Sequence, residues 1–339
     1  MRNKQIRILA ICATLIFISA CLYIKQEGGT TDIPSAQAST TPTGRSENLT
    51  GKIVFTASEE GDAQQRAVFV MDTGGSNLMR LTDYSIGATY PVWSPDGKKI
   101  AFASIKDGGI YTINADGTNL SRIVHKTVYD VYTDTWVIAG NDHPSWSPDG
   151  SVIVYESYGD EDSGTTVPNA NIYVVNSDGT GIRRLTNDLS YEGQPSWSPD
   201  GSKIAFVYVK DEGDGFSNYH IYVMNANGGN WVQLTDRNFT VNNLNPDWSP
   251  NGTKIVFTGD GDEHQGVFCI NLQDKSQTFI GVIGGKPKWS PDGTKIITDG
   301  WYSEGNISGS RIWITNADGS NSKKIETLMD AYEPDWTSQ

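Results

Sequence analysis

The pentapeptide Trp-Ser-Pro-Asp-Gly occurs four times, at residues 93–97, 146–150, 197–201 and 289–293. A fifth copy at residues 248–252 has Asn in place of Asp, and Trp336 stands in the related sequence Pro-Asp-Trp-Thr-Ser. The six Trp residues of these segments are 53, 51, 51, 41 and 47 positions apart. Periods of about 40 to 50 residues are typical of propeller blades. The chain is therefore expected to contain six related units.

Each unit contains four short strand-like segments in the same order. Strand A is Pro-x-Trp-Ser, as in residues 91–94, and strand B is an apolar run such as residues 99–102. Strand C has the form Ile-Tyr-x-x-Asn, as in residues 172–176, and strand D is short, as in residues 184–186. Six units of four antiparallel strands predict an all-β, six-bladed β-propeller.

The segments between these strands have the composition of tight turns. Ser-Pro-Asp-Gly places Pro second and Gly fourth, which is the preferred chemistry of a type I turn. Asn-Ala-Asp-Gly at residues 114–117 and 316–319 would serve the same purpose between strands C and D. The aspartates of these turns are predicted to be structural and not catalytic. The Trp of strand A is predicted to fill the space between adjacent blades.

The repeat begins out of phase with the chain. Residues 52–55, 68–72 and 80–82 match strands B, C and D of a first blade that lacks its own strand A. The remaining A-type segment is at residues 334–336. We predict that the C-terminal strand joins the first blade and closes the ring, which removes open sheet edges.

The N-terminus has the form of a secretory signal, with a basic start followed by an apolar stretch without charge over residues 8–24. Ile-Ser-Ala-Cys at residues 18–21 resembles the bacterial lipobox, so Cys21 is the predicted lipid attachment site. An uncleaved membrane anchor is the alternative. The expected organisation is a signal at 1–20, a flexible tether at 21–50 and the propeller at 51–339. The expected location is extracytoplasmic, in the periplasm or on the outer surface, with the lipid as the membrane contact.

Composition excludes some partners. The formal net charge is −14 and the isoelectric point is about 4.7, so no binding to nucleic acid is expected. Of the three cysteines, Cys12 and Cys21 lie in the N-terminal segment, which leaves Cys269 without a disulfide partner in the mature chain. Cys269 is predicted to be a small buried apolar residue.

Motifs for catalysis are lacking in the sequence. There is no Gly-x-Ser-x-Gly, His-x-x-His, His-Glu-x-x-His or Cys-x-x-Cys. No catalytic residue is therefore assigned and no cofactor is expected, with Ca²⁺ as the one ion considered. A site assembled from different blades, or a glycosidase-like carboxylate pair, stays open because spacing along the chain does not give distances across a ring.

The two faces of the predicted disc differ. A–B and C–D turns would emerge on one face, and the more varied B–C and D–A loops on the other. Four B–C loops carry acidic clusters, with Glu59, Asp62, Asp160, Asp162, Asp211, Asp214, Asp260 and Asp262 as the marker residues. This acidic ring would either be solvated charge that protects sheet edges or attract a basic partner or Ca²⁺.

The residues just before the A strands would meet at the channel mouth. The predicted ligand-binding set there is Tyr90, His143, Glu192, Asn245 and Glu333. The D–A connections also contain many aromatic residues, and loops on a rigid scaffold are where binding functions concentrate. We expect recognition to take place on this face.

The six copies of Pro-x-Trp and five of Ser-Pro-[Asp/Asn]-Gly make residues 51–339 resemble the TolB-like six-bladed propellers. The resemblance implies docking of an envelope protein or peptide on the propeller face. TolB itself has an α/β domain before its propeller, whereas this sequence has a signal and a tether there. The alternatives are an envelope glycan-binding module, or a lyase or glycosidase with its site at the channel mouth.

Overall fold

The computed structural model describes residues 51–338, apart from 59–61, 63, 126, 131–134, 139, 159–169, 189, 212–216, 237–239, 262–264, 282–283, 305–306 and 328. The chain divides into two units, Met1–Glu47 and Asn48–Gln339, and all described residues belong to the second. The predictions for the signal, the tether and Cys21 lie outside the described residues. Within the described part of the chain, no helix is long and apolar enough to cross a membrane.

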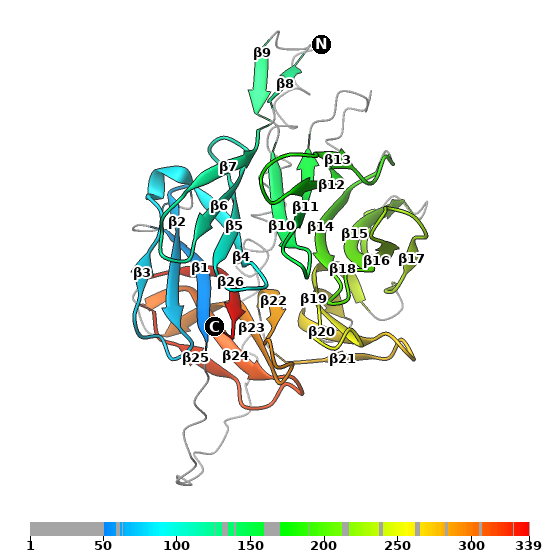
Figure 1. Cartoon of the computed structure of the whole chain (residues 1–339). Helices are drawn as coiled ribbons and strands as arrows, with labels where there is room; N and C mark the ends of the chain where they lie inside the picture. The colour runs from blue at the N-terminus through cyan, green and yellow to red at the C-terminus, as the bar shows by residue number, and fades with distance from the viewer. Residues whose placement is uncertain are drawn as a thin grey trace, which may run out of the picture. The chain divides into compact units, whose positions relative to one another are not determined.

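The described strands form six antiparallel sheets of four strands, the blades of a propeller (Figure 1). Blade 1 contains β26 (Ala331–Thr337), β1 (Lys52–Ser58), β2 (Arg66–Asp72) and β3 (Met79–Arg80). Blade 2 contains β4 (Ala88–Trp93), β5 (Lys99–Ser104), β6 (Ile110–Asn114) and β7 (Ser121–Val124). Blade 3 contains β10 (Asn141–Trp146), β11 (Val152–Tyr158), β12 (Ala170–Asn176) and β13 (Arg183–Arg184).

The other three blades have the same strand order. Blade 4 contains β14 (Glu192–Trp197), β15 (Lys203–Asp211), β16 (Ser217–Asn225) and β17 (Val232–Gln233). Blade 5 contains β18 (Thr240–Trp248), β19 (Lys254–Gly261), β20 (Gln265–Asn271) and β21 (Gln277–Phe279). Blade 6 contains β22 (Gly285–Trp289), β23 (Lys295–Glu304), β24 (Ile307–Asn316) and β25 (Lys323–Ile325).

Two short elements lie in the described parts of the D–A connections. A 3₁₀ turn, η2 (Tyr84–Ile86), follows blade 1. A hairpin of β8 (Thr127–Asp130) and β9 (Thr135–Ile138) is inserted between blades 2 and 3, and Figure 1 shows it extending away from the blades. The sequence indicates that this connection is long but does not predict its hairpin.

The ring is closed by the C-terminal strand. β26 pairs with β1 in antiparallel register, with Ile53 opposite Trp336 and Lys52 opposite Thr337. Figure 1 shows the red β26 beside the blue β1. The predicted six-bladed fold and its closure are therefore confirmed.

In the described part of the chain, the hydrophobic core is divided into six clusters, one between each pair of neighbouring blades. Adjacent residues of one central strand serve different clusters, since Ile53 and Phe55 face blade 6 whereas Val54 faces blade 2. This explains why the B strands are continuously apolar. The Trp residues of the A strands pack in these clusters, and all except the partly buried Trp197 are at most 9% exposed. Cys269 is buried in the cluster between blades 5 and 6, as predicted.

The aspartates of the A–B turns hold the turns together. The hydroxyl of Ser94 donates to Asp96 Oδ1 at 2.8 Å, and the Lys98 N–H donates to the same atom at 3.1 Å. Gly97 has φ of 64°, a left-handed conformation that suits glycine. The same contacts recur at Asp149, Asp200 and Asp292. The structural interpretation of these carboxylates is confirmed.

Candidate functional site

The A strands share a distortion that forms the channel mouth. In each blade the residue before the strand's Pro has a left-handed φ, which is uncommon for a residue other than Gly. These residues, named here the mouth ring, are Tyr90 (51°), His143 (49°), Gln194 (52°), Asn245 (54°), Lys286 (55°) and Glu333 (57°). Pairing between the A and B strands shifts register at this point in every blade. Such bulges redirect a side chain out of the regular strand alternation.

The mouth ring surrounds a narrow cavity. Its walls are the six mouth-ring residues, the six prolines that follow them, Val92 and Lys288. The space open to the centres of water molecules is about 50 Å³. This is enough for roughly three to five waters, so the cavity admits a small group such as a side-chain end and not a folded segment.

The structure places four of the five predicted mouth residues together, namely Tyr90, His143, Asn245 and Glu333. The placement of Glu192 at the mouth is wrong. Glu192 lies two residues before the bulge, pairs with Tyr208 and is fully buried in blade 4, while Gln194 lines the cavity instead. Lys286 was missed, although it precedes the Pro of Pro-Lys-Trp in the same way as the other ring members.

Neighbouring blades are joined through the mouth ring. Glu333 Oε2 accepts a hydrogen bond from the Tyr90 N–H at 2.7 Å, and Gln194 Oε1 accepts one from the Asn245 N–H at 2.7 Å. In both cases a ring side chain accepts from the bulged backbone of the next blade. A backbone N–H that a bulge removes from the ladder is thereby satisfied.

Glu333 is the charged centre of one side of the mouth. Its carboxylate is 2.6 Å from Lys286 Nζ, 3.3 Å from Arg66 and 3.0 Å from the Thr56 hydroxyl. Burial alone would raise the pKa of Glu333, but the charges of Lys286 and Arg66 and the Tyr90 N–H lower it to about 2. The Lys286 ammonium also lies 3.9 Å from the centre of the Tyr90 ring.

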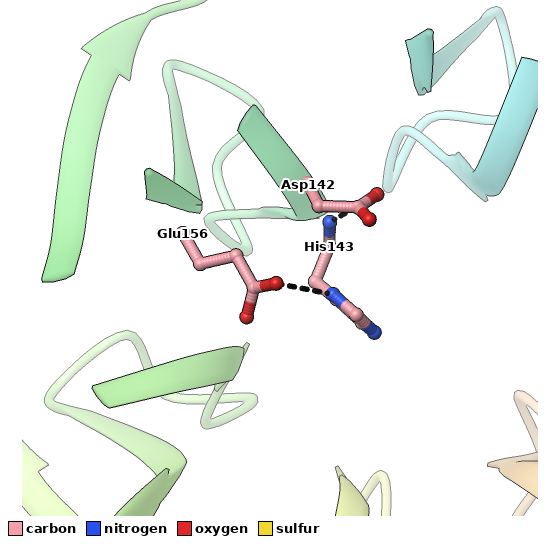
Figure 2. Close-up of side chains that lie close together, drawn as sticks. All are labelled: Asp142, His143 and Glu156. Atoms are coloured by element: carbon pink, nitrogen blue, oxygen red, sulfur yellow. Dashed lines mark hydrogen bonds and ion pairs between the residues drawn. The ribbon is translucent and has the colours of Figure 1, made fainter. Parts of the chain in front are cut away.

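His143 is the centre of the other side. Its ring is 3.6 Å from that of Tyr90, and its Nδ1 is 3.0 Å from Glu156 Oε1 (Figure 2). The other oxygen of Glu156 accepts the Gln194 N–H at 2.6 Å and the Tyr191 hydroxyl at 3.1 Å. Burial opposes ionisation of Glu156, but the charge and hydrogen bond of His143 outweigh it and lower its pKa.

Other buried or partly buried carboxyl groups lie near the mouth. Burial raises the pKa of Asp299 to about 6 and that of Asp335 to about 6. Burial and the negative charges of Glu156 and Glu333 raise the pKa of Asp142 to about 7, although the charge of His143 lowers it. Removing carboxylates from water favours their protonated form unless a cation is close. These carboxyl groups are therefore held partly in their protonated form.

The acidic ring of the B–C loops is described only in part. Asp62 is exposed and accepts from the Gln64 N–H at 2.9 Å, while Asp260 accepts from the Gln265 and Asn242 side chains at 2.7 and 2.9 Å. Asp211 is the last residue of β15. The other predicted members lie outside the described residues: Glu59, Asp160, Asp162, Asp214 and Asp262.

Aromatic residues in and next to the D–A connections have structural roles. Tyr84 packs against the cluster between blades 1 and 6, and Tyr332 lies 4.3 Å from the Arg66 guanidinium. Packing and contacts with cations therefore account for some of the aromatic residues in this part of the sequence, and a binding surface is not needed to explain all of them.

Known proteins support the same fold. The chain is 26% identical over 213 residues to the uncharacterized protein Atu1656 of Agrobacterium fabrum, which covers 60% of this chain and 65% of that protein. It is 28% identical over 188 residues to the TolB homolog of Chlorobium luteolum, covering 55% of this chain and 37% of that protein. The chain thus matches less than two thirds of the length of either relative.

A solved structure agrees in fold. TolB from Acinetobacter baumannii superposes with a TM-score of 0.68 at 22% identity, covering 84% of this chain and 66% of that one. The family profile described as the TolB beta propeller domain matches residues 139–339. The chain therefore belongs to the TolB β-propeller domain family.

Proposed function

We propose that this protein is an extracytoplasmic, lipid-anchored propeller that binds a protein or peptide of the cell envelope at its channel mouth. The observation that carries the proposal is the mouth ring. Six equivalent positions on a repeated scaffold carry six different side chains, namely those of Tyr, His, Gln, Asn, Lys and Glu. The turns on the opposite face repeat nearly the same sequence and offer little to distinguish partners.

The size of the cavity indicates how a partner would be held. A space of about 50 Å³ takes one side-chain end or a chain terminus. The rest of the partner would lie across the B–C and D–A loops. The net charge of −14 favours a partner with a basic surface, and binding would then weaken as salt is added.

The envelope location is supported by the signal-like N-terminus and by relatives named TolB. The lipid anchor is tested by Cys21→Ala in the full chain. We expect the wild type to partition into detergent with a mass that fits a lipid on Cys21, and the variant to lose this lipid. A variant that stays in the membrane with residues 1–20 attached would favour the uncleaved anchor.

The binding face is tested by photo-crosslinking in cells that produce the full chain. A photoreactive residue replaces Asn245 at the mouth or, as the control, Asn119 on the turn face. The two residues are matched, because both are Asn with left-handed φ, of 54° and 56°. We expect adducts from position 245 that protease digestion removes, and none from position 119.

The crosslinking result also separates the alternatives. Adducts from position 119 alone would overturn the assignment of the face. Adducts that resist protease but not polysaccharide digestion would identify the glycan-binding alternative. Turnover of a polysaccharide by the purified chain would identify the lyase or glycosidase alternative.

A further inference from the structure

We propose that Asp142, His143 and Glu156 bind a divalent transition-metal ion, with Zn²⁺ as the best match, at the wall of the channel mouth. One candidate ligand atom from each residue lies within 4.8 Å of the other two. The inference does not depend on the proposed partner, since it concerns the chain alone.

The backbone brings these side chains together. Asp142 on β10 and Glu156 on β11 are directly opposite in the register, so their side chains lie on the same face of blade 3. The next residue of a regular strand would point to the other face. Because His143 has φ of 49°, its imidazole instead lies beside the pair, with Nδ1 at 3.0 Å from Glu156 Oε1 (Figure 2).

The spacing suits a bound ion. Metal–ligand bonds of about 2.1 Å at near-tetrahedral angles place ligand atoms about 3.4 Å apart. The pair at 3.0 Å would have to separate slightly on binding an ion. A pair at the 4.8 Å limit would have to close by about 1.4 Å.

The carboxyl groups of the site have no Lys or Arg partner among the described residues. Among the described residues, the ion pairs made by Asp142 and Glu156 include no Lys or Arg, and His143 is the partner of Glu156. Two carboxyl groups thus lie beside one imidazole, and the carboxyl group of Glu156 is buried. A divalent ion would balance the charge that these side chains leave.

The surroundings would hold the ligands in place. Glu156 is fully buried and accepts hydrogen bonds from the Tyr158 hydroxyl at 2.7 Å and the Gln194 N–H at 2.6 Å. Asp142 accepts from the His143 N–H at 3.1 Å. Hydrogen bonds of this kind orient ligating carboxylates and increase metal affinity.

The equivalent positions of the other blades do not provide this donor set. Their cross-strand pairs carry at most one carboxylate: Tyr332–Thr56, Thr89–Ala103, Gly193–Val207, Leu244–Thr258 and Gly285–Asp299. The combination of two carboxylates with His in the mouth ring is specific to blade 3. A repeat that needed these groups for folding alone would place them in every blade.

The donor set indicates the class of ion. One imidazole nitrogen and two carboxylate oxygens suit Zn²⁺, which commonly takes three protein ligands and a water. Ca²⁺ prefers six to eight oxygen ligands and should bind more weakly here. The channel cavity, which His143 lines, would supply the water.

The test uses the full chain, treated with a chelator and then titrated with Zn²⁺ in a calorimeter. We expect one equivalent to bind and to raise the melting temperature. His143→Gln and Glu156→Gln should each weaken binding by about tenfold or more. Asp299→Asn is the matched control, because Asp299 has the position of Glu156 in blade 6 but pairs with Gly285. Its affinity for Zn²⁺ should equal that of the wild type.

Several results would overturn the proposal. The first is a folded wild type that does not bind Zn²⁺ stoichiometrically. The second is equal Zn²⁺ affinity of His143→Gln, Glu156→Gln and Asp299→Asn. The third is tighter binding of Ca²⁺ than of Zn²⁺. If the variants do not fold, the wild type still decides the question. Co²⁺ bound to the wild type should give visible absorption and a paramagnetic shift of the His143 ring signals, and signals at another histidine alone would contradict the site.

Discussion

At the scale of single residues, some mouth-ring side chains bind the neighbouring blade as well as line the cavity. Glu333 illustrates this, because it belongs to blade 1 but binds Lys286 of blade 6 and the Tyr90 N–H of blade 2. A substitution in the ring should therefore alter stability as well as binding. Assays of binding need a measure of folding beside them.

We predict that Lys286→Met lowers the free energy of unfolding by about 2 to 4 kcal/mol at pH 7, because it leaves the buried Glu333 carboxylate with Arg66 as its remaining ion-pair partner. Urea unfolding measures this loss, and Lys286→Arg should restore part of it. Lys98→Met is the control, since the Lys98–Asp96 pair is exposed and worth less than about 1 kcal/mol. Equal effects of the two Met variants would contradict the prediction.

At the scale of strands and turns, the repeat made the fold predictable. Every blade repeats a Trp, a turn and an apolar run. Because the same pattern occurs several times, a wrong strand assignment in one blade does not change the predicted fold. The position of the bulge was harder to predict. The bulge lies at the residue before the Pro of strand A, which in blade 4 is Gln194. The prediction chose Glu192 instead, two residues earlier, and that residue is buried in the blade and does not line the cavity.

The partner of His143 could not be predicted from the sequence. Glu156 lies inside β11, whose sequence Val-Ile-Val-Tyr-Glu-Ser-Tyr is that of a buried strand. Only the register between β10 and β11 brings it opposite Asp142. Register between strands is set by packing and turn geometry, which single residues do not reveal.

We predict that Trp336→Ala destabilises the propeller by about 3 to 5 kcal/mol, because it empties a space in the cluster that closes the ring between blades 1 and 6. Trp301→Ala is the matched control, since Trp301 is 56% exposed and should cost little. Calorimetric melting compares the two. Deleting residues 333–339 should be more severe, and an unchanged melting temperature would argue against closure by β26.

At the scale of the whole molecule, buried carboxyl groups should make stability depend on pH. Burial raises the pKa of Glu192 to about 8, and those of Asp299 and Asp335 to about 6. A raised carboxyl pKa contributes stability that is complete below the unfolded value of about 4 and is lost as the pH rises through the folded value. Glu333 has a lowered pKa of about 2, so the stability that it contributes is lost as the pH falls. This loss occurs only below about pH 4.5.

We therefore predict that the chain melts at a higher temperature at pH 5 than at pH 8. Glu192→Gln isolates the largest contribution, because Gln occupies the same buried space without titrating. The variant should melt close to the wild type at pH 5, where Glu192 is protonated in the folded state, and about 2 to 5 °C above it at pH 8.5, where the wild type has a buried charge. Calorimetry at pH values between 5 and 8.5 measures both trends. A wild-type melting temperature that rises over this range, or a variant with no advantage at pH 8.5, would show that Glu192 ionises without cost.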